Sequence, residues 1–546
     1  MKRWAVVLAL VVTLAFGVQA VAQVPRGGIV RWNPHPAGPW PDTYNPFSPG
    51  LEQNWVLIYE PLLHFNELTV EIEPWLAESY AWNDDLRTVT FEIRPSVQWH
   101  DGELLTAEDV EFTFNLMKEF PALDTQSVWA ILESVQAVDQ DTIVMKLKQV
   151  SVPSLWYIAE QVPIVPQHIW STVRDPVTFV NRKPVGTGPF KLGRYRPEVI
   201  RFDRNPDYWQ PGKPYVDGVE VVAFKLNDDA FLALLRHELD YVNNFIPDIE
   251  KTFVSRDPED NHYWFAPNGV VTLYTNTARY PLSLREVRWA IAMAIDRKEL
   301  VDKAYYNYGE PASPAGPVMV PTLTDWWNSS IPATFTLDPE RSIRILEGLG
   351  FERGRDGIFV TPDGKRLEFS IIVVNGWTDW VAECQLMAQQ LKKIGMDVTV
   401  EALDFGAYFS KLQRGDFDLG ISWTTFGPSP FFGYSDLLHS KFSAPVGETA
   451  MGTNWHRWTS DQVDALLDAF ASTADPEEQK GILYNLQSIF FHELPSIPLH
   501  YSAMWYEYVT ENFVGWPDVS NPYAMGGPGS TIAESAKVLS NVHLKK

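Results

Sequence analysis

The most restrictive feature of the sequence is the stretch at residues 73–117, which reads EPWLAESYAWNDDLRTVTFEIRPSVQWHDGELLTAEDVEFTFNLM. Polar and apolar residues alternate over 88–94, with Val89, Phe91 and Ile93 on one face, which predicts a half-buried strand. An Asp-Gly turn follows, and Thr106 with acidic residues behind it predicts a helix N-terminus with a capping box. The stretch therefore predicts a compact β–β–turn–helix unit.

The length and charge of the chain limit what surrounds this unit. With 546 residues the chain is too long for one ordinary core, and two or three domains are expected. Hydrophobic residues make up 45% and charged residues 21%, a globular composition. A formal net charge of −25 argues against nucleic acid or an anionic membrane surface as partner, since both need basic patches.

The first residues read as an export signal. Lys2 and Arg3 precede an apolar run at 5–18, and an A-x-A pattern at 20–22 predicts cleavage before Gln23. A membrane anchor is the alternative, but the run is short for a span. Cys384 is the single cysteine, so no lipid anchor and no disulfide framework are available. We expect a secreted or periplasmic protein without a lipid.

Several motifs resemble those of family 5 solute-binding proteins, the extracytoplasmic receptors of ATP-driven (ABC) importers for oligopeptides, nickel and oligosaccharides. Within the first stretch they are PWLAESYAW, FEIRPSVQWHDG and LTAEDVEFTFN. Further matches are a GG-strand at 27–31, YEPLL at 59–63, VGTGPF at 185–190 and RNPDYW at 204–209.

The resemblance implies an α/β fold of the two-lobed periplasmic-binding-protein type, with an extra inserted domain and a ligand cleft between hinged lobes. The expected organisation is a signal peptide at 1–22, lobe I at 23–66, 185–280 and 507–546, an inserted domain at 67–184, and lobe II at 281–506. The implied partner is an ABC transporter permease in the membrane, and we expect the receptor to be a monomer.

Periodicity and capping patterns predict further elements in the rest of the chain. These are a hairpin at 134–148, helices at 229–241 and 283–304 (the latter with a capping box of Ser283 and Glu286), strands at 273–277 and 494–499, and helices beginning at Asp338-Pro339 and Asp475-Pro476.

Motifs for catalysis and for cofactors are missing. The glycines at 186 and 188 are followed by Pro189 and lack a Lys-Ser/Thr pair, so no P-loop is present. The sequence contains neither G-x-S-x-G nor H-E-x-x-H. We expect no enzyme activity, no cofactor and no metal. A secreted glycoside hydrolase stays as the alternative, because the 69 Asp and Glu residues include candidate carboxylate pairs.

The segment NGWTDW at 375–380 gives the sharpest indication of the ligand. Trp377 and Trp380 lie three residues apart at a helix start and share one face. Packing of both rings in the core is the alternative. The segment resembles the cello-oligosaccharide and β-gluco/manno-oligosaccharide receptors of the family, as do SVW at 127–129, YPLSL at 280–284 and NPYA at 521–524.

An oligopeptide is the alternative ligand within the family. Peptide receptors of the family usually hold the ligand ammonium with an Asp after a W-x-x-D-like turn, and the equivalent region 422–428 offers none. Against the sugar branch, the residues after NPYA lack the aromatic side chains that those receptors carry.

Trp rings can stack on pyranose faces, and side-chain amides can bond to hydroxyl groups. We therefore expect an oligosaccharide site made mainly of Trp and Asn side chains. The candidates are Trp32, Trp40, Asn45, Trp129, Asn244, Asn276, Trp377, Trp380, Trp423, Asn454, Trp505 and Asn521.

Overall fold

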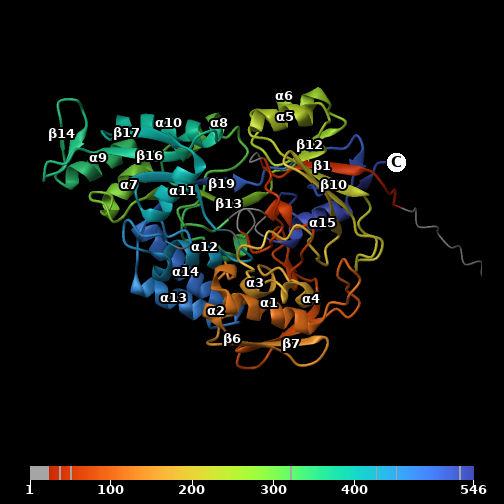
Figure 1. Cartoon of the computed structure of the whole chain (residues 1–546). Helices are drawn as coiled ribbons and strands as arrows, with labels where there is room; N and C mark the ends of the chain where they lie inside the picture. The colour runs from red at the N-terminus through yellow and green to blue at the C-terminus, as the bar shows by residue number, and fades with distance from the viewer. Residues whose placement is uncertain are drawn as a thin grey trace, which may run out of the picture.

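The computed structural model describes residues 24–35, 39–48, 52–319, 323–425, 427–450, 452–527 and 531–546. The expected signal peptide at 1–22 and its cleavage site lie outside these ranges. The described chain has the mixed α/β, two-lobed periplasmic-binding-protein fold that the resemblance implied (Figure 1).

The first lobe is built on a sheet that gathers distant parts of the chain. In the described residues its strand order is β12-β20-β11-β1-β10-β9-β8. Its strands are β1 (Ile29–Asn33), β8 (Phe190–Arg196), β9 (Val199–Arg204), β10 (Gly218–Val222), β11 (Tyr241–Val242), β12 (Asn261–Tyr263) and β20 (Glu507–Val509). The strand predicted from the double glycine is therefore present as β1, which pairs in parallel with both β10 and β11.

The second lobe has its own sheet, with the order β17-β16-β18-β13-β19 in the described residues. The strands are β13 (Pro267–Thr275), β16 (Glu368–Val374), β17 (Asp397–Leu403), β18 (Leu419–Trp423) and β19 (Ser496–Ala503). The strands predicted at 273–277 and 494–499 correspond to β13 and β19. β13 pairs in this sheet although its residues fall inside the range expected for lobe I.

Residues 73–117 supply two strands of an antiparallel sheet with the order β4-β5-β7-β6 in the described residues, and the hairpin predicted at 134–148 supplies the other two. Its strands are β4 (Ala77–Trp82), β5 (Thr88–Ile93), β6 (Leu132–Ala137) and β7 (Thr142–Leu147). Helix α1 (Ala107–Glu119) lies along it (Figure 1). Asp109 accepts a hydrogen bond from the backbone N–H of Thr106 at 2.9 Å, which fixes the predicted start of α1.

Short strands and helices complete the described chain. The strands are β2 (Leu63–Phe65), β3 (Ile72–Pro74), β14 (Glu352–Arg353), β15 (Phe359–Val360), β21 (Phe513–Val514) and β22 (His543–Leu544). The remaining α-helices are α2 (Val128–Ile131), α3 (Ser154–Ala159), α4 (Gln167–Trp170), α5 (Asn227–Leu235), α6 (Ile249–Thr252), α7 (Arg285–Ala294), α8 (Arg297–Lys303), α9 (Pro339–Gly348), α10 (Thr378–Lys393), α11 (Phe405–Arg414), α12 (Pro430–Leu438), α13 (Asp461–Ala471), α14 (Pro476–Glu493) and α15 (Ala533–Asn541).

Two predicted helices differ from the structure. The helix expected over 283–304 is two helices, α7 and α8, because Asp296 caps α8 by accepting the Glu299 N–H at 3.0 Å. The predicted N-cap at Ser283 is also wrong, since Leu284 is the residue that precedes α7. The helix expected over 229–241 is shorter in the structure: it corresponds to α5, which ends at Leu235. His237 then adopts a left-handed φ of 55°, which ends helical geometry and directs the chain into β11.

Two chain segments connect the sheets of the two lobes. One joins β12 to β13 and the other joins β19 to β20. They run side by side, because the Trp264 N–H donates to the Tyr506 carbonyl at 3.0 Å and the Met504 N–H donates to the Ala266 carbonyl at 2.8 Å. Paired connections of this kind are suited to hinge motion between lobes.

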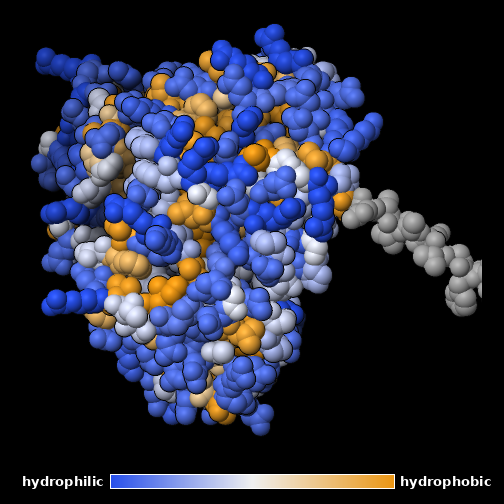
Figure 2. Space-filling view, turned by 45° about the vertical axis from the view of Figure 1, so that its right-hand side comes forward, coloured by the Kyte–Doolittle hydropathy of each residue, from blue (hydrophilic) through white to orange (hydrophobic). Residues whose placement is uncertain are grey.

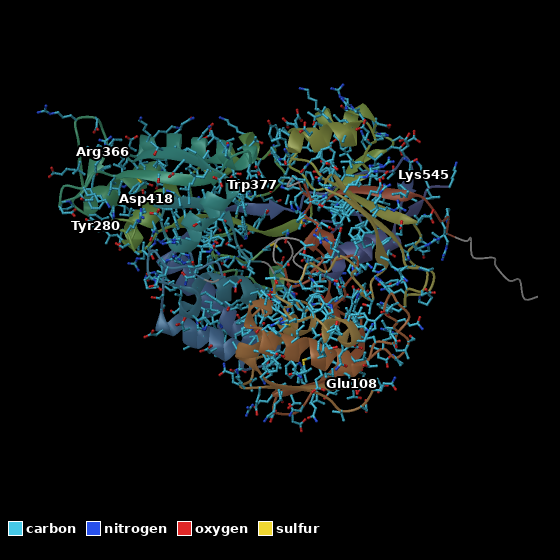
Figure 3. The ribbon with its side chains drawn as sticks, viewed as in Figure 1. Glu108, Tyr280, Arg366, Trp377, Asp418 and Lys545 are labelled. Carbon is cyan, nitrogen blue, oxygen red and sulfur yellow. The ribbon has the colours of Figure 1, made fainter. Side chains whose placement is uncertain are left out.

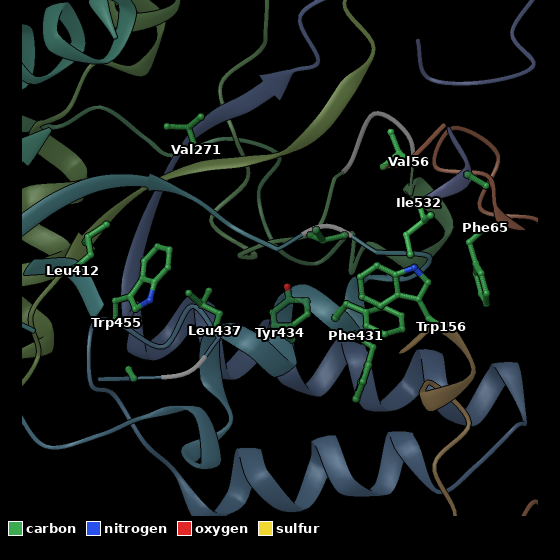
Figure 4. Packing of buried hydrophobic residues seen from close by; sticks show 14 of the residues in the cluster. Val56, Phe65, Trp156, Val271, Leu412, Phe431, Tyr434, Leu437, Trp455 and Ile532 are labelled. Atoms are coloured by element: carbon green, nitrogen blue, oxygen red, sulfur yellow. The ribbon is translucent and has the colours of Figure 1, made fainter. Parts of the chain in front are cut away.

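Apolar packing forms a second connection, between the α1–α4 region and the second lobe. Trp156 of α3 lies beside Phe431 of α12 and Ile532 of the C-terminal segment (Figure 4). The rings of Trp156 and Phe432 have centroids 4.7 Å apart. The α1–α4 region and the second lobe therefore share one buried cluster in this conformation.

A buried charged triad ties three segments together. His64 of β2 lies 3.0 Å from Glu534 of α15 and 3.8 Å from Glu160, which follows α3, and all three side chains are fully buried. Burial favours the neutral imidazole, but the two carboxylates outweigh it and raise the pKa of His64 to about 9.

We expect His64→Ala to destabilise the protein by about 3–5 kcal/mol, because it leaves two buried carboxylates without their cation. Since the folded-state pKa lies above the unfolded value, this stabilisation is complete below about pH 6.5 and is lost as the pH rises through about 9. The melting temperatures of wild type and His64→Ala should differ most at about pH 6.5 and least above about pH 9. His168→Ala is the control, because its pair with Asp101 is partly exposed and should contribute under about 1 kcal/mol. Equal melting temperatures of wild type and His64→Ala at pH 6.5 would contradict the ion triad.

Candidate functional site

A cavity of about 330 Å³ lies where the two lobes and the paired connections meet. We call it the cleft cavity. It is lined by Pro34, His35, Asn227, Asn243, Asn244, Phe245, Tyr305, Trp377, Asp379, Trp380, Trp423, Ser502, Ala503, Met504 and Trp505. In Figure 3 Trp377 lies toward the middle of the molecule, whereas Tyr280, Arg366 and Asp418 lie at the far end of the second lobe.

Three indole rings of the second lobe form one wall of the cleft cavity. The centroids of Trp377 and Trp380 are 4.9 Å apart in an edge-to-face arrangement. Trp423, at the end of β18, lies 6.2 Å from each of them. Trp380 is buried and Trp377 is half-buried at the N-cap of α10. The preceding Gly376 has φ +95°, a conformation that favours glycine and brings the chain from β16 into this helix.

A second aromatic group surrounds Trp505, in the connection between β19 and β20. Its ring centroid lies 5.4 Å from that of Phe245 and 5.3 Å from that of Tyr305. These rings line the same cavity as the three indoles. The cavity therefore presents flat apolar surfaces from the second lobe and from the connection that leads to the first lobe.

Two asparagines after β11 supply amide groups near these rings. The Asn243 side chain accepts from Trp32 Nε1 at 3.1 Å and donates to the Trp505 carbonyl at 2.6 Å, so it fixes the Trp505 backbone. The side-chain amide of Asn244 is buried without a hydrogen-bond partner among the described residues. Its backbone N–H donates to Glu507 at 3.2 Å.

A buried ion pair lies next to the cavity lining, because the His500 ring centroid is 4.2 Å from that of Tyr305. His500 Nε2 is 3.1 Å from Glu383 Oε2, and His500 Nδ1 is 3.0 Å from the Tyr501 carbonyl, so both ring nitrogens face acceptors. Burial opposes the charged imidazole, but Glu383 outweighs it and the pKa of His500 is raised. Burial, and then the charge of Glu383, raise the pKa of Asp379 to about 7.

The structure brings five of the predicted site residues into the cleft cavity, namely Asn244, Trp377, Trp380, Trp423 and Trp505. Trp32 lines a neighbouring cavity of about 500 Å³ that shares Pro34 and His35 with the cleft cavity. Its ring stacks on Tyr241 at 5.6 Å.

The other predicted residues lie elsewhere. Side-chain amides of Asn45, Asn276 and Asn454 donate to backbone carbonyls and hold local chain geometry. Asn521 is exposed in a turn. The indole N–H groups of Trp40 and Trp129 likewise donate to backbone carbonyls, at 3.1 and 2.7 Å.

Sequence reasoning missed several residues of the site, among them Asp379, Asn243, Phe245 and Tyr305. Asp379 stands inside the NGWTDW segment, and its position between two Trp residues could have identified it. Asn243, Phe245 and Tyr305 carry no comparable sequence pattern. They reach the cavity because β11, the α8 region and the β19–β20 connection meet there.

Across the described ranges, no helix is long and apolar enough to span a bilayer. The same residues contain no group of three or more His, Cys, Asp or Glu side chains placed to hold a metal ion. On the face in Figure 2, hydrophilic residues cover most of the surface and apolar residues gather in patches along its middle.

Comparison with known proteins gives consistent matches over nearly the whole chain. A family model described as bacterial extracellular solute-binding proteins, family 5, middle, matches residues 71–444. The di/tripeptide-binding protein 1 of Pseudomonas aeruginosa is 24% identical over 542 residues, covering 92% of this chain and 95% of that protein. The peptide transport periplasmic protein SapA of Salmonella typhimurium is 25% identical, covering 84% of each.

Solved structures extend the similarity to the tertiary level. The mannohexaose-bound periplasmic oligopeptide-binding protein of an oligopeptide ABC transporter from Thermotoga maritima superposes with a TM-score of 0.84 at 28% identity, covering 96% of this chain and all of that chain (100%). Another crystal structure of that protein gives a TM-score of 0.88, also at 28% identity, and covers 95% of this chain and 99% of that chain.

Proposed function

Because this chain belongs to the family 5 bacterial extracellular solute-binding proteins, the receptors of ABC importers, we propose that its ligand is a β-linked gluco- or manno-oligosaccharide. The proposed site is the cleft cavity, and the proposed partner is a cognate permease in the membrane.

One observation carries the proposal. Trp377, Trp380 and Trp423 meet in the cavity that Trp505 lines from the connection between the lobes. Pyranose rings have apolar faces that stack on indoles, while their hydroxyl groups need polar partners such as Asn244 and Asp379. The mannohexaose in the Thermotoga maritima protein supports this ligand class.

Hinge closure gives the arrangement its function. Contacts from both sides of the cavity exist together only when the lobes are closed, so a ligand that bridges them stabilises the closed state by its differential affinity. The paired connections at Trp264 and Met504 are placed to bend in this motion. A closed, liganded receptor is then the form that the permease recognises.

The cavity is better suited to binding than to hydrolysis. Glycosidases use two carboxyl groups that flank the scissile bond. Among the described lining residues, Asp379 is the one carboxyl group, and Glu383 beneath it is fully buried against His500. We propose that the protein holds its ligand without cleaving it.

An oligopeptide is the second candidate ligand. Curated relatives are named as di/tripeptide-binding proteins, and Asp379 could pair with a peptide ammonium.

A thermal-shift screen separates these candidates. Cello-, manno-, xylo- and laminari-oligosaccharides are compared with mixed di- and tripeptides at equal concentration. A ligand at 100 times its Kd stabilises the folded state by about 2.7 kcal/mol. We expect this stabilisation from at least one β-linked gluco- or manno-oligosaccharide. Stabilisation by peptides alone would reject the oligosaccharide assignment and favour the second candidate.

A further inference from the structure

Asp379 has an unusual environment for a carboxyl group. It lies in the first turn of α10, between Trp377 and Trp380 in the sequence, and is 8% exposed. Burial, and then the charge of Glu383, raise its pKa, and the N–H groups of Trp380 and of Asp379 itself oppose this rise only in part. No side chain among the described residues donates a hydrogen bond to it.

Titratable groups face Asp379 from several elements. Glu383 and Cys384 lie one turn later on α10, His500 lies on β19, Tyr305 follows α8, and His35 follows β1. Of these, Glu383 is the largest electrostatic neighbour and His500 opposes it. The pKa values of Tyr305 and Cys384 are raised by burial, so both stay neutral near pH 7. Burial lowers the pKa of His35, which favours its neutral ring.

We propose that Asp379 is the specificity-determining acceptor of the cleft cavity: in its ionised form it accepts hydrogen bonds from ligand hydroxyl groups, and binding is therefore coupled to release of its proton. The proposal rests on the proposed function, since it requires a neutral, hydroxyl-rich ligand. No covalent step is involved, and the released proton passes to the solvent.

The geometry supplies the reason. The Asp379 carboxyl group lines the same cavity as three indole rings, so it can meet the edge of a sugar whose face lies on one of them. Hydrogen bonds to an ionised acceptor are about twice as strong as those to a neutral one, so the ligand selects the carboxylate. The unliganded pKa of about 7 places this selection within the ordinary working range of pH.

The affinity of the wild type should then follow pH. With an unliganded pKa of about 7 and an ionised complex, binding of the best oligosaccharide from the screen should be roughly ten-fold weaker at pH 6 than at pH 8. Calorimetric titration at pH 6.5, in buffers of different ionisation enthalpy, should register release of roughly three quarters of a proton per ligand.

Asp379→Asn is the matched variant, because it keeps the shape and one acceptor oxygen but cannot ionise in this range. We expect it to bind about ten-fold more weakly than wild type at pH 8 and to show no change in affinity between pH 6 and pH 8. A purely structural role for Asp379 would leave the pH profile of the remaining affinity unchanged.

The outcomes are distinguishable. Saccharide binding by wild type without pH dependence and without proton release overturns the role of Asp379 and leaves the proposed function standing. The same pH profile in Asp379→Asn also overturns it. If no saccharide binds at any pH while a peptide binds and is lost in Asp379→Asn, both proposals fail and the carboxylate pairs with an ammonium. The wild-type proton measurement decides the question even if Asp379→Asn does not fold.

Discussion

Trp377→Ala should weaken oligosaccharide binding by roughly ten- to a hundred-fold while leaving the unliganded protein folded. The half-buried ring lines the cleft cavity, and burying an aromatic surface of this kind under a ligand contributes about 1.5–3 kcal/mol. Each 1.4 kcal/mol corresponds to about a factor of ten in affinity. Calorimetric titration with the best oligosaccharide measures the loss, and a thermal melt of the unliganded variant measures the structural cost.

Two other substitutions make the result interpretable. Trp129→Ala removes a Trp that is also half-buried but lies outside the cavity, so it should leave the affinity unchanged. Trp380→Ala removes a buried ring and should cost about 3–5 kcal/mol of stability, more than Trp377→Ala. Unchanged affinity in Trp377→Ala, or a stability loss as large as that of Trp380→Ala, would remove Trp377 from the ligand surface.

Glu383→Ala should lower the stability of the unliganded protein by about 3–5 kcal/mol. The carboxylate and His500 are both fully buried and 3.1 Å apart, so removing one partner leaves an unbalanced buried imidazolium. Since Glu383 lies one turn after Asp379 on α10 and His500 packs on Tyr305, loss of the pair should also disturb the cavity. The measurement is thermal or denaturant unfolding of wild type and variant without ligand.

Two other carboxylate substitutions serve as controls, one at the same position and one on the surface. Glu383→Gln keeps the side-chain shape and an acceptor for His500, so we expect a smaller loss than with alanine. Glu340→Ala removes a carboxylate that is 89% exposed on α9 and should change stability by less than about 1 kcal/mol. If Glu383→Ala and wild type have the same melting temperature, the pair is not held as buried charges.

Local elements were predictable because their causes are local. Alternation over 88–94 placed β5, and Thr106 with Asp109 placed the start of α1. At Asp475 the carboxylate accepts the N–H groups of Glu477 and Glu478, as its position before a helix-starting proline indicated. Here a side chain interacts with backbone only a few residues away, so the sequence alone determines the outcome.

The helix break at Asp296 marks the limit of this reasoning. Apolar periodicity continues through the break, and the sequence signal for one long helix was therefore wrong. Arg297, the first residue of α8, donates to the Pro498 carbonyl of β19 at 2.8 Å, a contact between segments about 200 residues apart. The local cap at Asp296 and the contact with the distant strand both favour the break, and the second of them arises only in the tertiary structure.

The family of solute-binding receptors followed from the sequence by itself, because its motifs are contiguous. Which tryptophans form the site did not. Trp40 and Trp377 are equally apolar in the sequence, yet one donates its indole N–H to β10 and the other lines the cleft cavity. A ring that stacks on a ligand and a ring that packs in a core need the same apolar surface. Only the meeting of α10, β18 and the β19–β20 connection decides which surface is left for a ligand, and Asp379 acquires its shifted pKa from that same meeting.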